Sequence, residues 1–200
     1  MTSPKQILND PEPIEPKLAR FLYKKYAPGF LAICIRYCGN RKDGEDALHD
    51  GFIKILQNLS KFKEIKGGSF EGWMKRIIIN TVLNYIRDHA VEKKFLDIDP
   101  LNEIISEADE EENYFERLSG NINAGEVMNM ICELPLGYRT VFNMYVFESY
   151  SHNEIAEILK CSVNTSKSQL SKARKLLRQK LNKEYDNQFA HNGKAESPSR

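Results

Sequence analysis

Apolar residues recur at intervals of three and four along two long stretches of this chain, with few alternating patterns. Such intervals place side chains on one side of an α-helix, whereas a strand needs a period of two. We therefore expect an all-α fold. The clearest groups are Phe21, Leu22 and Tyr26; Leu31, Ile35 and Cys38; Ala47, Leu48, Phe52, Ile55 and Leu59; and Trp73, Ile77, Val82 and Ile86.

Three local signals predict where helices begin and end in the first stretch. Pro28 suits the first turn of a helix, where its missing N–H costs nothing. The acids Asp43, Glu45 and Asp46 predict a helix start, because the helix dipole favours negative charge there. The paired glycines of KEIKGGS predict a loop before a helix that begins at Phe70.

Charge divides the chain, although the net charge is only +1. Residues 17–96 carry 16 basic and 8 acidic side chains, residues 97–116 carry nine acids and no base, and residues 117–183 carry 10 basic and 5 acidic side chains. Two basic segments around an acidic one indicate two small domains and a flexible linker. The predicted organisation is a disordered tail (1–16), a domain (17–96), an acidic linker (97–121), a second domain (122–183) and a disordered tail (184–200).

The remaining composition argues against a membrane protein, a secreted protein and an enzyme. No apolar run approaches membrane-spanning length, and the polar N-terminal segment with four prolines is unlike a signal peptide. The four cysteines include no C-x-x-C pair, which favours reduced thiols in the cytoplasm, although Cys34, Cys38 and His49 are an alternative metal site. No phosphate-binding loop or nucleophile elbow is present, so we expect no catalysis and no cofactor.

A cap, a break and a second cap mark residues 151–181, SHNEIAEILKCSVNTSKSQLSKARKLLRQKL. Ser151 and Glu154 form the S-x-x-E capping box of a short helix, the KCS tripeptide breaks that helix, and Ser162 can cap a second one. From Ile158 to Lys183 there are eight Lys or Arg and no acid. This pattern predicts a helix-turn-helix whose second helix enters the major groove of DNA.

The second helix of this unit is expected to have an inward stripe and a DNA-facing surface. The stripe is Val163, Ser166, Leu170, Ala173 and Leu177. On the other faces, Lys and Arg can neutralise phosphates, while Gln, Ser and Thr can reach base edges. The candidate DNA contacts are Asn164, Thr165, Lys167, Ser168, Gln169, Ser171, Lys172, Arg174 and Lys175. A solvated amphipathic helix is the plainer alternative. Lys160 stands where such turns often have Gly, and a left-handed backbone there would cost about 1 kcal/mol.

Three motifs in one order give the chain a family resemblance. They are LYKKYAPGFLAICIRYCGNRKDGEDALHDGFIKIL, FEGWMKRIIINTVLNYIR and TSKSQLSKARKLL. From Lys17 to Lys183 the chain resembles the extracytoplasmic-function (ECF) sigma factors of bacterial RNA polymerase, in the sigma-70 family. The resemblance implies a region 2 helical bundle, a region 4 helix-turn-helix, and promoter recognition through −35 and −10 elements. It also implies three partners: core RNA polymerase (beta-prime clamp helices and beta flap), promoter DNA, and an anti-sigma factor.

The resemblance also assigns roles to residues of the first domain. The acidic DGED-type helix would dock on core polymerase through Asp43, Glu45, Asp46, His49 and Asp50. The family usually has Gln at His49 and Ala at Gly44. Recognition and opening of the −10 element would use Lys61, Phe62, Lys63, Lys66, Trp73, Arg76, Asn80 and Arg87. For Phe62 and Trp73 a structural role is an open alternative. In the second domain, Ser166 and Gln169 replace the family's usual Val and Arg.

Other functions and one regulatory role are also compatible with these features. A helix-turn-helix regulator would bind duplex DNA without polymerase, and an interaction adaptor would use its basic faces to bind acidic proteins. The acidic linker could lie against a basic domain and suppress DNA binding by the free protein, or it could be a soluble spacer.

Overall fold

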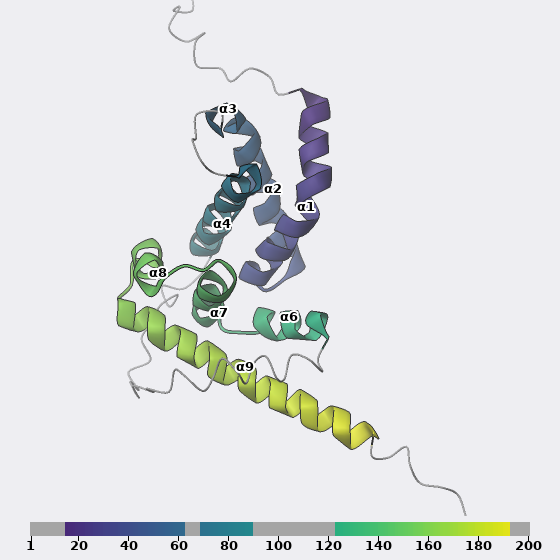
Figure 1. Cartoon of the computed structure of the whole chain (residues 1–200), viewed down its shortest axis with the longest axis vertical. Coiled ribbons are helices and arrows are strands. Elements are labelled where there is room, and N and C mark those ends of the chain that lie inside the picture. Colours follow the sequence, from purple (N-terminus) through teal and green to yellow (C-terminus); the bar gives the residue numbers. More distant parts are fainter. Residues whose placement is uncertain (1–14, 63–68, 90–122, 193–200) are drawn as a thin grey trace, which may run out of the picture. The chain divides into compact units, whose positions relative to one another are not determined.

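The computed structural model describes residues 15–62, 69–89 and 123–192, without the side chains of Lys61 and of residues 185–192. Within these ranges every regular element is a helix, which confirms the all-α prediction. The chain divides into two compact units, residues 1–90 and 91–200 (Figure 1). The predicted acidic linker, residues 1–14 of the predicted N-terminal tail and residues 193–200 of the predicted C-terminal tail lie outside the described residues, as do Lys63 and Lys66, so the predicted domain limits stay predictions.

The first unit is a helical bundle. Its helices are α1 (Pro16–Cys38), α2 (Arg41–Gln57), the single turn α3 (Leu59–Phe62) and α4 (Phe70–His89). Helices α1, α2 and α4 pack on one another. The expected start of α4 at Phe70 is confirmed. The core is made of Leu22, Phe30, Cys34 and Tyr37 from α1, Leu48, Phe52 and Ile55 from α2, and Met74, Ile78, Val82 and Ile86 from α4.

Pro28 does not begin a helix, so that prediction is wrong. It lies inside α1, where its ring nitrogen has no N–H to donate to the carbonyl of Lys24. The helix continues because Leu22, Phe30 and Cys34, on either side of Pro28, are buried on the same side of α1. Burial of that continuous face offsets the lost hydrogen bond. The helix ends at Gly39, whose φ of 82° is left-handed.

The start of α2 is fixed by a side-chain cap and by a close approach to α1. The Asn40 side-chain oxygen accepts from the Asp43 backbone N–H at 2.9 Å, and the predicted acidic helix start is confirmed. Gly44 faces Ile35 of α1, and a Cβ built on Gly44 would lie 3.0 Å from the Ile35 Cα. Because Gly44 has no side chain, the backbone of α2 can approach the backbone of α1 closely at this point.

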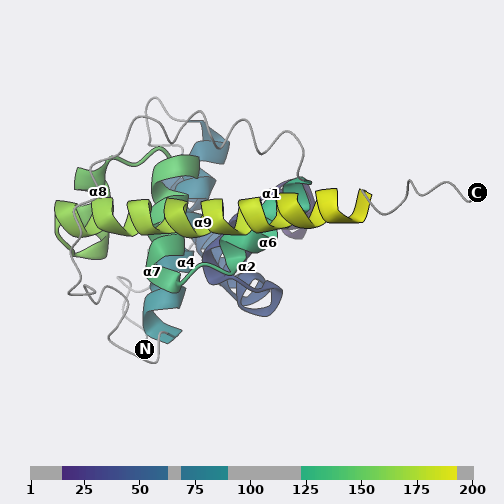
Figure 2. The same ribbon diagram turned by 90° about the horizontal axis from the view of Figure 1, so that it is seen from below.

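The second unit consists of α6 (Ala124–Cys132), α7 (Leu136–Phe142), the π-helix η2 (Asn143–Phe147), α8 (His152–Leu159) and α9 (Val163–Asn192). Figure 2 shows α9 running across α7 and α8, and α9 also contacts α6. Helix α9 continues past residue 183, where the sequence predicted a disordered tail. The core is made of Ile131, Leu134, Val141, Phe142, Met144, Ile155, Leu170, Ala173, Leu177 and Leu181.

A buried arginine links α6 to α7. The Arg139 side chain is 8% exposed, and one of its guanidinium nitrogens donates to the carbonyls of Cys132 at 2.6 Å and Leu134 at 2.9 Å. Arg139 thereby satisfies carbonyls left over at the end of α6. Nothing in the periodicity of the sequence distinguished this arginine from the cations on the surface.

Candidate nucleic-acid interface

Helices α8 and α9 form the predicted helix-turn-helix. At the start of α8, the Ser151 Oγ accepts from the Glu154 N–H at 3.3 Å, and the Glu154 carboxylate accepts from the Ser151 N–H at 2.8 Å. The Ser151 hydroxyl also donates to the Glu154 carboxylate at 2.7 Å, and this bond, followed by the one from the Ser151 N–H, holds the pKa of Glu154 below its usual value. At the start of α9, the Ser162 Oγ accepts from the Thr165 N–H at 2.9 Å. Both predicted caps are confirmed.

The turn between these helices has a left-handed residue. Lys160 has φ 54° and ψ 45°, the conformation in which a side chain is strained. The next residue, Cys161, donates its N–H to the carbonyl of Ala156 at 3.0 Å. The predicted strain at Lys160 is therefore present, and the turn is held by backbone hydrogen bonding.

One face of α9 collects most of the predicted DNA contacts. Along it Asn164, Lys167 and Lys175 are exposed, and Ser168, Ser171 and Arg174 are half-buried. Their spacing of three and four residues places them together on one face of α9, which is separate from the buried stripe of Ser166, Leu170, Ala173 and Leu177 and borders it at Arg174. We call this set the outer face of α9: Asn164, Lys167, Ser168, Ser171, Arg174 and Lys175. Arg178 shares this register, and our sequence-based prediction omitted it.

Three other predicted contacts lie elsewhere on α9. Thr165 is only 8% exposed and Gln169 only 6%, so the expectation that both lie on an outward face is wrong. Each stands beside the inward stripe, on a flank that the unit's own packing covers. The Gln169 Oε1 is buried and has no hydrogen-bond partner among the described residues. Lys172 is half-buried at the edge of the outer face.

Helix α4 gathers its four predicted contacts on one face. Trp73, Arg76, Asn80 and Arg87 follow at intervals of three, four and seven, which is one side of a helix. Arg76, Asn80 and Arg87 are exposed and Trp73 is half-buried. Asn84 is exposed and shares this register. Our sequence-based prediction of the −10 contacts omitted Asn84.

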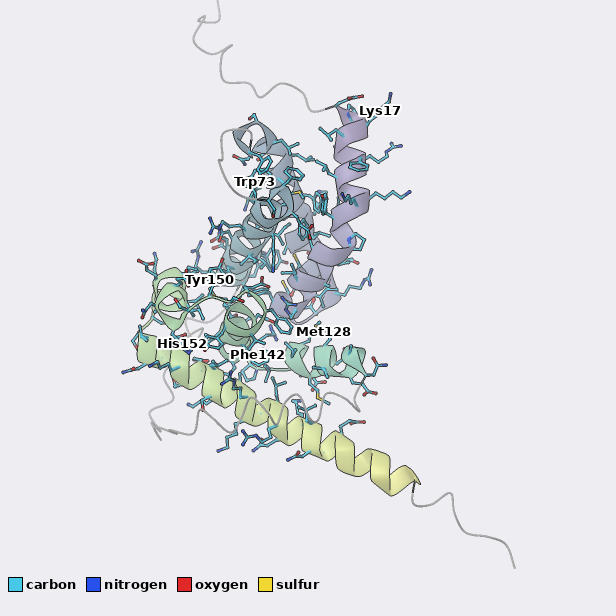
Figure 3. The ribbon with its side chains drawn as sticks, viewed as in Figure 1. Lys17, Trp73, Met128, Phe142, Tyr150 and His152 are labelled. Atoms are coloured by element: carbon cyan, nitrogen blue, oxygen red, sulfur yellow. The ribbon has the colours of Figure 1, made fainter. Side chains whose placement is uncertain are left out.

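Three aromatic rings meet at the α3 end of α4, where Figure 3 labels Trp73. The ring centroids of Phe62 and Phe70 lie 4.9 Å apart, those of Phe62 and Trp73 5.4 Å, and those of Phe70 and Trp73 5.7 Å. Such contacts hold all three rings in place. Trp73 and Phe62 are each half-buried, so each ring packs within the unit and also leaves part of its surface exposed.

The predicted docking residues on α2 divide into two groups. Asp46, His49 and Asp50 are exposed and lie on one face of α2. Ile53 lies three residues after Asp50, so it shares this face, and it is 42% exposed. The sequence-based prediction did not include Ile53. A groove beside this face is lined by Tyr23, Lys24, Ala27, Pro28 and Leu31 of α1 and by Arg41, Glu45, Asp46, Leu48 and His49 of α2.

Asp43 and Glu45 are engaged within the unit. The Asp43 carboxylate accepts from the Asn40 side-chain amide at 2.8 Å and from the Tyr85 hydroxyl of α4 at 3.5 Å. Partial burial, helped by Asp43 and Asp46, raises the pKa of Tyr85 to about 12. Glu45 pairs with Arg41 at 2.7 Å. Asp43 therefore helps to hold α2 against α4.

The alternative metal site is contradicted. Cys34 is buried, and burial together with Cys38 raises its pKa to about 12. No group of three or more metal-ligating side chains occurs in residues 15–62, 69–89 and 123–192. Over the same ranges, no helix has the length and apolar character needed to cross a membrane.

Comparison with protein families finds a match for each of the two units. Residues 22–91 match the model for sigma-70 region 2, and residues 124–177 match a model for sigma-70 region 4. The chain is an ECF sigma factor of the sigma-70 family. The two matches cover the helical bundle and the helix-turn-helix in the order that the sequence motifs predicted. The resemblance is thus confirmed, and a helix-turn-helix regulator separate from polymerase is not favoured.

Two relatives agree with this sigma factor assignment. The chain is 28% identical over 178 residues to the ECF RNA polymerase sigma-E factor of Haemophilus influenzae, covering 82% of this chain and 88% of that protein. It is 26% identical over 163 residues to the ECF RNA polymerase sigma factor SigW of Bacillus subtilis, covering 78% and 84%. A co-crystal structure of the sigma factor RpoE with the anti-sigma factor NepR from Bartonella quintana matches with a TM-score of 0.48 and 20% identity, covering 82% and 96%.

Proposed function

We propose that the three surfaces described above divide the work of this sigma factor. The outer face of α9 binds the −35 element, the exposed face of α4 with Phe62 captures the −10 strand, and the exposed face of α2 docks on core polymerase. Polymerase supplies the chemistry, in the cytoplasm, and the sigma factor supplies binding. The observation that carries the proposal is the cationic outer face of α9, which the fold directs away from its own core.

The −35 part of the proposal depends on charge as well as on base contacts. Lys167, Arg174 and Lys175 can neutralise phosphates, and each neutralised phosphate steepens the fall of affinity with salt. Asn164 and the serines of the same face can reach base edges. Gln169 is left out of this set because its side chain is buried in the free unit.

The −10 part rests on the neighbouring aromatic and polar groups of α4. Trp73 and Phe62 offer ring faces on which an unstacked base can lie, and such stacking contributes about 1–3 kcal/mol per base. Asn80 can hydrogen-bond a base edge, and Arg76 and Arg87 can hold the backbone. Lys61, Lys63 and Lys66 belong to the proposal by sequence position alone.

The docking part rests on Asp46, His49, Asp50 and Ile53. Rim charges of this kind set encounter rate and register, while the apolar Ile53 can supply buried contact. The clamp helices of beta-prime are the expected partner of this face, and the beta flap is the expected partner of the second unit. An anti-sigma factor that keeps the protein inactive is proposed from the family resemblance alone.

A matched pair of lysines tests the proposal. The full-length Lys175→Ala protein is combined with core polymerase to form holoenzyme. This holoenzyme should bind a promoter more weakly, and its affinity should fall less steeply with salt, by the slope of about one phosphate contact. Lys183→Ala is the control, because Lys183 is an exposed cation of the same helix outside the outer face. Equal effects of the two substitutions would contradict the assignment of this face to DNA.

A second pair tests the docking face. Asp50→Asn should weaken binding of the sigma factor to core polymerase, while Glu71→Gln, an exposed acid on α4, should leave it unchanged. The binding is measured by titrating core polymerase with labelled full-length protein. Loss of core binding in both variants, or in neither, would count against the proposed docking face.

A further inference from the structure

A chain of contacts joins the π-helix, the start of α8 and the outer face of α9. The rings of Tyr145 and His152 stack with centroids 4.6 Å apart and an interplanar angle of 24°. The guanidinium carbon of Arg174 lies 5.8 Å from the centroid of the Tyr145 ring. The His152 Nδ1 lies 2.9 Å from the Ser166 Oγ, and this hydrogen bond fixes the imidazole at its edge. Figure 3 labels His152 at the start of α8.

Each link of this chain limits the freedom of the next. Ser166 is fully buried on the inward stripe of α9, so its hydroxyl is a fixed point for His152. The stacked imidazole then restricts the Tyr145 ring, which is 36% exposed. An arginine placed over an aromatic face gains about 0.5–1 kcal/mol at an exposed site. Arg174 is consequently held before any DNA arrives.

The charge of His152 suits this arrangement. Burial, then the nearby cations Lys167 and Arg174, lower the pKa of His152 below its usual value, so the ring is neutral at pH 7. A neutral ring can stack on Tyr145 without repelling the two cations of α9. Because Arg174 is already held in place, it loses less side-chain entropy when DNA binds.

We propose that His152 is a positioning residue for promoter binding, which acts by holding Tyr145 so that Tyr145 holds the Arg174 guanidinium toward a DNA phosphate. This inference rests on the proposed role of the outer face of α9 in binding the −35 element. His152 itself needs no contact with DNA.

The test is a double-mutant cycle on full-length protein in holoenzyme, with affinity for a promoter duplex as the readout. His152→Ala should lower affinity about three- to fivefold in the wild-type background, the equivalent of one cation–π contact. In the Arg174→Ala background the same substitution should have no further effect. His152→Phe, which keeps an aromatic ring beside Tyr145, should recover most of the lost affinity.

A purely structural role for His152 gives a different result. A general loosening of the helix-turn-helix would lower affinity by the same factor with or without Arg174, and such multiplicative losses would overturn the inference. The proposed function is tested in the same experiment by the wild-type holoenzyme. If wild-type binding does not depend on a −35 element, the proposed function fails and the inference fails with it; if that dependence is intact, multiplicative losses overturn the inference alone.

Discussion

Lys160 adopts a left-handed backbone in the turn of the helix-turn-helix, with φ 54°. Glycine has no Cβ to clash in this region, so Lys160→Gly should raise the free energy of unfolding by about 1 kcal/mol. Urea denaturation of the full-length protein measures the change.

Lys160→Ala is the matched control for this substitution. It removes the same charge as Lys160→Gly but keeps the Cβ that causes the strain. It should therefore give no gain in stability. Equal stabilisation by Gly and Ala would show that the charge, and not the backbone, is responsible.

His152 should make stability depend on pH. The pKa of this residue in the folded protein lies below its usual value of 6.5, because of burial and of Lys167 and Arg174. The unfolded chain therefore binds a proton more readily, and the folded state loses stability as pH falls below about 6.5. The Tyr145 ring is also packed against His152.

His152→Phe isolates this effect, because it removes the titrating group and keeps an aromatic ring. Urea midpoints measured at pH 7.5 and pH 5.5 should move less in His152→Phe than in the wild-type protein. An equal shift in both proteins would assign the pH dependence to other groups. Glu154, whose pKa is also lowered, contributes to a separate loss of stability at more acidic pH.

Among the elements, the contact between α1 and α2 depends on Gly44. A Cβ at this position would lie 2.8 Å from a side-chain carbon of Ile35 and 3.0 Å from its backbone. Because helix α1 would have to move, Gly44→Ala should lower the free energy of unfolding of the first unit by about 1–3 kcal/mol. Thermal or urea unfolding followed by circular dichroism gives the measurement.

For Gly29, in the same unit, we expect substitution by Ala to have the opposite effect on stability. It lies inside α1, and nothing stands within 4 Å of a Cβ built on it. Gly29→Ala should therefore stabilise the protein by about 0.5–1 kcal/mol through helix propensity. If both Gly→Ala substitutions stabilise the protein, the close approach of α1 and α2 is not a constraint.

Local signals predicted most helix starts but not the continuity of the elements. The S-x-x-E box, Ser162 and the acids after Asn40 act within one turn, so the sequence alone was enough to find them. Pro28 was misread because the face of α1 on either side of it is buried against α2 and α4, and this tertiary packing outweighs a local preference. The length of α9 was missed because the composition after Lys183 is polar.

Side-chain direction on α9 was predicted less well than the helix itself. The spacing of apolar residues predicts which side of α9 is buried. How many neighbouring residues are buried with that side depends on how the other helices of the unit pack around it. Thr165 and Gln169 lie at that boundary, and packing within the unit buries both. The π-helix replaces a regular helical turn, and the contact of Tyr145 with His152 depends on how the chain turns between η2 and α8, so helical spacing indicated neither.

On the scale of the whole molecule, the sequence predicted two cationic helical modules in one order, and the two family matches agree with both. The division of charge along the chain and the order of the motifs were enough to predict the two modules. The contacts that hold each module together, such as those of Arg139 and Asp43, depend on the folded structure instead. Sequence reasoning therefore predicted the two modules better than it separated exposed residues from packing residues.

A random promoter library transcribed by core polymerase with and without the full-length protein tests the central claim most directly. The claim is that this chain binds polymerase and chooses where it begins. The expected result is a set of transcripts that needs the protein, from templates sharing two short elements at a fixed spacing, with either element necessary. Transcripts that are the same with and without the protein, or selected templates with no shared elements, would contradict it.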